Sequence, residues 1–264
     1  MTALSSLFLS HGSPDIVVAD TEAHAFLAKL GRELPRPDAI VVVSAHFEAG
    51  GVAISGDRTP ATIHDFGGFA KELYAIEYRA PGCPALAQRL ACMMRNGGLA
   101  AGVVCDRGFD HGTWVPLHLI YPDADIPVVQ VSVDPHAGPE HHFRLGQALE
   151  PLRHENILIV GSGSMTHNLK EAFAAFRSGE RGAAMPAWVA QYVDWMDRKL
   201  ENADLDALLA YRERAPFAVE NHPTDEHLMP LFSALGAAGE GWSTRKLHSS
   251  CDFGVLSMNA YAFQ

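Results

Sequence analysis

Short apolar runs alternate along the chain with longer stretches in which apolar residues recur three or four positions apart. Each apolar run has about the length of a β-strand and is bounded by turn residues. We predict strands over residues 4–10, 38–45, 51–55, 101–105, 127–133, 156–161, 243–248 and 254–262. The spacing of three and four is typical of amphipathic helices. We predict helices over residues 20–33, 84–96, 138–150, 185–200 and 225–236.

Strands that alternate with helices are typical of an α/β sheet that helices cover on both faces. We therefore predict an α/β fold with three layers, α/β/α, around a central mixed sheet. The sequence has no fixed-period repeat, low-complexity tract or linker that would mark a domain boundary. A chain of 264 residues can bury roughly three quarters of its unfolded surface, so we expect a single domain over residues 1–264.

The composition excludes several classes of partner. The formal net charge is −11, so the phosphates of a nucleic acid or an anionic membrane would be repelled. No apolar run approaches the ~20 residues of a membrane span, and the first residues lack the basic region and cleavage site of a signal peptide. We expect a cytoplasmic protein. The four cysteines form no CxxC pair, which indicates reduced thiols and argues against a cysteine-ligated zinc site.

The 14 histidines are the unusual feature of the composition. His11 follows the apolar run LFLS and His46 follows AIVVVSA, so both stand where a predicted strand ends. The carboxyl ends of strands in open α/β sheets, and the loops after them, carry ligand sites. Three more segments place histidines in turn-like surroundings: FDHGTWVPL (His111), GSGSMTHNL (His167) and ENHPTDEHLMPL (His222 and His227).

A catalytic divalent metal ion needs about three protein ligands, and neutral imidazole is the commonest of them. His11 and His46 would supply two ligands from strand ends. His227 is the best third ligand, because PTDEHLMPL has the N-terminal signals of a helix. His222 precedes a proline, which favours an extended backbone and a different direction. We expect His222 to contact the substrate or to lie behind the ligands.

His111 and His167 remain as candidates for proton transfer, since histidine titrates near neutral pH. His167 follows the run Gly161–Ser164, whose small residues would let a ligand approach the backbone. This run lacks the lysine of a phosphate-binding loop and the Gly-x-Ser-x-Gly pattern of a nucleophilic serine. Trp114 and Phe109, beside His111, form either an apolar wall of the site or part of the ordinary core.

Six motifs, spread over nearly the whole chain, point to one family. They are, in order, SHGSP, SAHFE, DFGGFAKELYAIEY, DHGTWVPL, GSGSMTHNL and HPTDEHLMPL. In this order they resemble the class III extradiol ring-cleavage dioxygenases, in the single-domain branch related to DOPA 4,5-dioxygenase. The resemblance implies an oxidoreductase with a non-haem Fe(II) site, which inserts O2 into the ring of a catechol and gives a muconic semialdehyde.

The resemblance also implies roles for individual residues. His11, His46 and His227 match the metal ligands, His167 matches the acid/base histidine, and His111 matches a second pocket histidine. In zinc-containing members of the branch the residue that matches His167 closes a four-coordinate site, so both roles stay open, as does Zn(II) beside Fe(II). We expect substrate contacts from Ser13, Asp65, Phe66 and His222.

Two other functions stay open on the sequence alone. The opening LFLSHGS also resembles small metal chelatases of tetrapyrrole synthesis, although SAHFE and HPTDEHL have no purpose in that family. A zinc-binding protein without catalytic activity would have a closed site with four ligands. The identity of the catechol is also open, because His64 and Gly67 stand where this branch typically has aromatic residues. The oligomeric state is open too, with a homo-oligomer as one option.

Overall fold

The structure is a computed structural model that describes residues 3–264. Eight strands form its main sheet: β1 (Ser6–Ser10), β2 (Ala39–Glu48), β3 (Val52–Ser55), β4 (Ala101–Val104), β5 (Val128–Val133), β6 (Ile157–Gly163), β7 (Thr244–His248) and β10 (Ala260–Phe263). Their order across the sheet is β4-β3-β5-β2-β6-β1-β10-β7. A separate small sheet pairs β8 (Cys251–Asp252) with β9 (Leu256–Ser257).

The centre of the main sheet is parallel and its flanks contain antiparallel pairs. Strands β5, β2, β6 and β1 run parallel, whereas β3 pairs antiparallel with β5, and β10 pairs antiparallel with β1 and β7. The valines of β2 are buried on both faces, as expected for a central parallel strand with helices above and below it. The register places Ser44 beside Ser162 and Ser10 beside Gly163, so β2, β6 and β1 end at the same edge.

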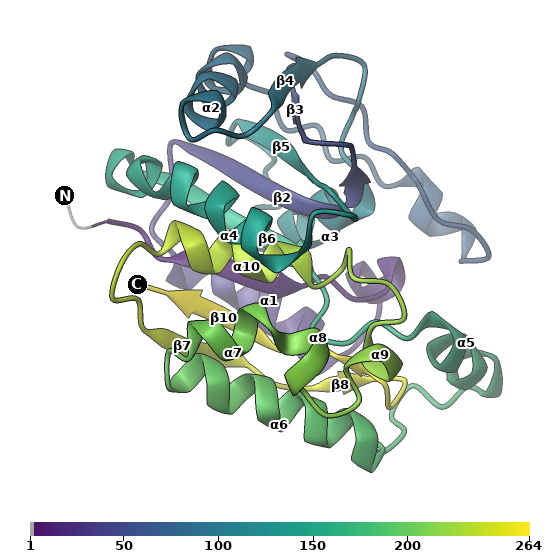
Figure 1. Cartoon of the computed structure of the whole chain (residues 1–264). Coiled ribbons are helices and arrows are strands. Elements are labelled where there is room, and N and C mark those ends of the chain that lie inside the picture. Colours follow the sequence, from purple (N-terminus) through teal and green to yellow (C-terminus); the bar gives the residue numbers. More distant parts are fainter. Residues whose placement is uncertain (1–2) are drawn as a thin grey trace.

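Helices cover both faces of this sheet. They are α1 (Glu22–Glu33), α2 (Pro84–Asn96), α3 (His111–Ile120), α4 (Gly138–Leu149), α5 (Leu169–Ser178), α6 (Ala187–Glu201), α7 (Leu205–Leu209), α8 (Tyr211–Arg214), α9 (Ala218–Asn221) and α10 (Met229–Ala237). Short 3-10 helices are η1 (Pro14–Val17), η2 (Lys71–Ala75) and η3 (Glu150–Glu155). Figure 1 shows α4 and α10 in front of the central strands and α1 and α3 behind them.

Two hydrophobic cores lie on the two faces. In β1, Phe8 joins the core beneath α2, α4, α6 and α10, whereas Leu7 and Leu9 join the core beneath α1 and α3. This alternation follows from the period of two along a strand. The predicted three-layer α/β/α architecture with a central mixed sheet is confirmed. Among the helices of residues 3–264, none combines the length and the apolar composition needed to cross a bilayer.

Helix α3 was not predicted from the sequence. It contains Gly112 and Pro116, which are poor helix formers, and it is buried on nearly all sides, so it lacks the polar face of an amphipathic helix. Its first turn is fixed by Asp110, whose Oδ1 accepts a hydrogen bond from the backbone N–H of Thr113 at 3.1 Å. The Asp110 cap therefore places His111 at the first position of the helix.

Two predicted elements differ from the structure by more than a small shift of their ends. The helix expected from residue 225 begins at Met229, because Pro230 occupies the first turn of α10 and residues 223–228 form bends and turns before it. The strand expected over residues 254–262 is divided into β9 and β10. The N-terminal signals at Pro223 and Thr224 were therefore misread: they belong to the turn that carries His227.

Candidate metal centre

Five of the predicted histidines come together at the edge where β1, β2 and β6 end. His11 directly follows β1, and His46 lies near the end of β2. His167 comes from the loop after β6, His111 from the start of α3, and His227 from the turn before α10. The parallel register of β2, β6 and β1 explains why residues far apart in sequence meet here.

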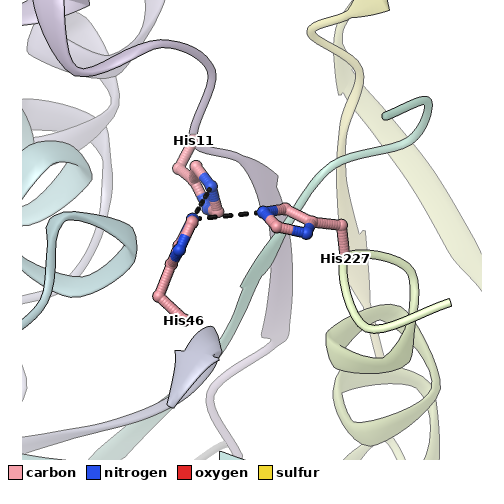
Figure 2. A group of neighbouring side chains, drawn as sticks. All are labelled: His11, His46 and His227. Carbon is pink, nitrogen blue, oxygen red and sulfur yellow. Dashed lines mark hydrogen bonds between the residues drawn. The ribbon is translucent and has the colours of Figure 1, made fainter. Parts of the chain in front are cut away.

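Three imidazoles direct their Nε2 atoms toward one point. Nε2 of His46 lies 3.1 Å from Nε2 of His11 and 3.1 Å from Nε2 of His227. Figure 2 shows the three rings converging from separate segments of the chain. Two nitrogens bound to one ion at ~2.1 Å lie about 3.0 Å apart at a right angle and about 3.4 Å apart at a tetrahedral angle. Both observed separations fall within this interval, and the three ligand atoms all lie within 4.8 Å of one another, so they fit a divalent metal ion.

In two of these rings, hydrogen bonds keep the proton on Nδ1, the nitrogen that faces away from the point of convergence. The hydroxyl of Ser162 donates to the carbonyl oxygen of Gly112, so its oxygen accepts from Nδ1 of His11 at 3.0 Å. A carboxylate oxygen of Glu226 lies 2.9 Å from Nδ1 of His227 and can only accept. Both histidines therefore carry their proton on Nδ1 and present a lone pair at Nε2, as metal ligands require.

The environment keeps these imidazoles neutral. His11 and His227 are only 2% and 4% exposed. Burial first, and then the neighbouring imidazoles, lower the pKa of His11 and of His227 well below 6.5. Burial and the neighbouring His111 also lower the pKa of His46 well below 6.5, although Asp65 acts to raise it. A cluster of buried neutral imidazoles with converging lone pairs is a suitable donor set for Fe(II) or Zn(II).

Asp65 connects the candidate ligands to His111. Its Oδ1 accepts hydrogen bonds from the backbone N–H of His111 at 3.0 Å and from Nδ1 of the same residue at 2.9 Å. Its Oδ2 lies 3.6 Å from Nδ1 of His46. Burial alone would raise the pKa of Asp65, but the hydrogen bonds that it accepts from His111 help to lower that pKa to about 2. Asp65 is therefore ionised, and its two hydrogen bonds orient His111 while its other oxygen faces His46.

His167 lies against one candidate ligand. Its ring stacks on that of His227 with centroids 3.4 Å apart, and its Nδ1 lies 3.8 Å from a carboxylate oxygen of Glu226. Burial, followed by the nearby His222 and His111, lowers the pKa of His167 to about 3. The ligand atoms of His167, Glu226 and His227 lie within 4.8 Å of one another, so this position suits either a proton acceptor or a fourth ligand.

A cavity of about 330 Å³ opens beside these histidines, a volume near the lower end for small-molecule sites. Eight of the nine predicted site residues line it: His11, Ser13, His46, Asp65, Phe66, His111, His167 and His227. The hydroxyl of Ser13 donates to Asp15 at 2.6 Å. His222 is the exception. It is fully buried behind the cavity, with Nε2 2.9 Å from the carbonyl oxygen of Met165, and it supports the loop that carries His167.

The glycines of the Gly161–Ser164 run make room for the protein itself. A Cβ at Gly161 would lie 2.1 Å from the carbonyl oxygen of Pro230, and one at Gly163 would lie 2.1 Å from that of His227. These glycines therefore let the start of α10 approach β6; of the small residues in this run, Ser164 is the one that lines the cavity. Trp114 and Phe109 are also fully buried in the core beneath α1 and α3, outside the cavity lining.

Several residues of the centre were not found from the sequence. Ser162 and Glu226 fix the tautomers of His11 and His227. Asp110 is fully buried and accepts hydrogen bonds from Ser44, Arg107 and Gln130 as well as capping α3. The cavity is also lined by apolar residues that the sequence did not single out, namely Leu169, Phe173 and Phe176 of α5 and Phe253. Only the alternation of serine and glycine in GSGS could have indicated that one side of β6 is polar.

The chain matches the family model described as the catalytic LigB subunit of aromatic ring-opening dioxygenase, over residues 5–263. It is 38% identical to "4,5-DOPA dioxygenase extradiol" of Beta vulgaris, covering 98% of this chain and 96% of the relative. It is 41% identical to the protein of the same name from Escherichia coli K12, covering 89% and 86%. The crystal structure of an uncharacterized protein from Escherichia coli K12 matches with a TM-score of 0.78 at 31% identity, covering 98% and 99%.

These matches favour neither the chelatase nor the non-catalytic zinc protein. They cover almost the whole chain, and the family model and both named relatives describe ring-opening or extradiol dioxygenases. The expected resemblance is thereby confirmed. The chain belongs to the family of the catalytic LigB subunit of aromatic ring-opening dioxygenases and is a metal-dependent class III extradiol dioxygenase, an oxidoreductase that acts on a small aromatic substrate and O2.

Proposed function

We propose that the substrate is a catechol and that Fe(II), held by His11, His46 and His227, is the ion of the active enzyme. The observation that carries this proposal is the convergence of the three Nε2 atoms beside a small, largely apolar cavity. Bound there, the ion would supply a positive centre that binds the deprotonated catechol oxygens and O2 and transfers electron density between them. Zn(II) has no redox chemistry, so we assign it at most the role of an inactive occupant.

The protein groups around the ligands would move the protons. We assign to His167 the acceptance of a phenolic proton, because it lines the cavity directly against the ligand His227. His111 carries a proton on Nδ1, where Asp65 holds it, so its Nε2 is free to accept a proton from the reacting ring or return one to it. Its ring centroid lies 3.8 Å from that of His46, whereas the ring of His167 stacks on that of His227.

The rest of the cavity would position the ring and exclude water. Phe66 packs its ring edge-on against His111, with centroids 5.7 Å apart, and together with Ser13 it would contact the catechol. An apolar wall beside the reacting groups lowers the local dielectric constant, which strengthens their electrostatic interactions. Because two relatives are named for DOPA, L-DOPA belongs in the panel of catechols that tests this proposal.

The test is oxygen uptake by Fe(II)-loaded protein with a panel of catechols, recorded together with the yellow absorbance of a ring-opened semialdehyde. Uptake with a yellow product is the expected result. If the protein holds stoichiometric iron and consumes no O2 with any catechol, the proposal is wrong. The proton-transfer role of His167 has its own test: His167→Ala should keep the ion and lose turnover, whereas loss of the ion would make His167 a fourth ligand.

A further inference from the structure

The outer part of the cavity is built from aromatic and aliphatic side chains. Leu169, Phe173 and Phe176 lie three and four residues apart on one side of α5 and are 45%, 45% and 40% exposed. Large apolar residues rarely gather on an open surface without a function. All three line the cavity that contains the candidate metal ligands, so this stripe faces whatever occupies that cavity.

The stripe continues across the cavity mouth. The ring of Phe176 lies 5.9 Å from that of Phe69 and 5.7 Å from that of Phe253, and Phe69 in turn lies 5.5 Å from Phe66. These centroid distances are typical of interacting aromatic pairs. Residues from the loop before η2, from α5 and from the loop after β8 thus form one continuous aromatic rim.

Apart from the proposed metal ion, the charged side chains that line the cavity are acids. Among the lining residues that the structure describes, Asp65 and Glu226 are the acids and none is a lysine or an arginine. Both acids are already hydrogen-bonded to histidines. Arg181 packs over the ring of Phe253 at 4.7 Å, but it is paired with Asp15 at 2.7 Å and faces Asp252 at 3.7 Å. A carboxylate on the substrate would therefore lose its hydration without gaining a counter-ion.

We propose that this cavity selects catechols whose ring substituent is short, apolar and uncharged, and that it discriminates against those with a carboxylate. This inference rests on the proposed function, since it concerns the substituent of the same catechol. An apolar chain gains about fourfold in affinity for each methylene group that the aromatic rim buries. A cavity of about 330 Å³ has room for a single ring with a short chain.

Four ligands with the same dihydroxyphenyl ring test the inference: 4-propylcatechol, 3-(3,4-dihydroxyphenyl)propionate, dopamine and L-DOPA. Calorimetry without O2 on the Zn(II)-loaded protein measures binding without turnover, because zinc is not redox-active. We expect 4-propylcatechol to bind at least tenfold more tightly than each of the other three. If a charged member binds as tightly as 4-propylcatechol, or if none of the four binds, the inference is overturned.

A positive charge placed on the rim should reduce this preference. Phe173→Arg provides a counter-ion at the cavity mouth. It should reduce the ratio of the affinity for 4-propylcatechol to the affinity for the propionate at least tenfold. Leu169→Arg repeats the test at a second rim residue with the same exposure. The matched control is Val104→Arg, which adds the same charge to an exposed valine of edge strand β4. An equal change in the control would mean that long-range charge, rather than the rim, sets the preference.

Oxygen uptake by the Fe(II)-loaded protein separates this inference from the proposed function. Ring cleavage without the expected order of binding would overturn the selectivity alone. The expected order of binding without ring cleavage of any catechol would overturn the proposed function alone, and the aromatic rim would remain a selective binding site.

Discussion

Replacing Gly163 with alanine should damage the metal centre without changing any ligand. A Cβ at Gly163 would lie 2.1 Å from the carbonyl oxygen of His227, where ordinary contact begins near 3.4 Å, so that carbonyl must retreat by about 1.3 Å. Nε2 of His227 lies only 3.1 Å from Nε2 of His46, so such a shift displaces His227 from its position beside the other two candidate ligands. A steric cost of about 2 kcal/mol would also lower the Tm by roughly 4–8 °C in a chain of this size.

The matched control is Gly102→Ala in edge strand β4, where a Cβ would have no heavy atom within 4 Å. Its stability should stay within about 0.5 kcal/mol of the wild type. Calorimetry on metal-free protein gives the Tm, and competition with a chromophoric chelator gives the affinity for Zn(II). We expect Gly163→Ala to lose about 10–100-fold in affinity. If it binds Zn(II) as tightly as Gly102→Ala does, the steric reasoning is refuted.

Three further predictions concern other parts of the structure. Ser162→Ala should weaken Zn(II) binding about 10–100-fold, because Nδ1 of His11 loses its acceptor. The control Ser6→Ala, which removes another buried hydroxyl from a carbonyl partner, should leave the affinity for Zn(II) unchanged. An equal loss of Zn(II) affinity in the two variants would contradict this role of Ser162. His227→Ala should lose the ion on gel filtration, whereas His111→Ala should keep it and lose about 10²–10⁴-fold in turnover; full activity in both variants would place the site elsewhere. Burial lowers the pKa of His142 from 6.5 to about 4, so the unfolded chain takes up this proton at a higher pH than the folded protein, and acid favours unfolding in that window. Urea titrations at pH 7.5 and pH 5 measure how far the free energy of unfolding falls between the two. This fall should be about 2 kcal/mol smaller in His142→Gln than in the wild type. An equal fall in both proteins would disprove this assignment.

Local sequence pattern was sufficient to locate the two candidate ligands at strand ends. His11 and His46 each end an apolar run that only a buried strand accommodates, and the carboxyl ends of neighbouring parallel strands meet at one edge. His227 was placed correctly beside them in space, although the helix after it begins later than expected. The error concerned a turn whose proline and acidic residues imitate a helix start.

The surroundings of the ligands could not be predicted, because their contacts are not local. Ser162 lies 151 residues from His11, and Asp65 lies 46 residues from His111. No pattern within a strand or a loop indicates which serine or aspartate will meet which histidine. Helix α3 was missed for a related reason: burial on all sides hides the period of a helix and tolerates Gly112 and Pro116. The aromatic rim likewise exists only once α5 and the loop before η2 lie side by side.

The candidate ligands are widely separated along the chain: His46 lies 35 residues from His11 and 181 residues from His227. The sheet that brings them together is also completed late, because β1 pairs with β10. During synthesis two ligands leave the ribosome long before the third, and no segment of the nascent chain that ends before residue 227 holds all three. An ion that binds only the folded state stabilises it by about 4 kcal/mol at a thousandfold excess over Kd. Binding of an ion by all three histidines therefore requires the native topology of nearly the whole chain, so bound metal would report that this topology has formed.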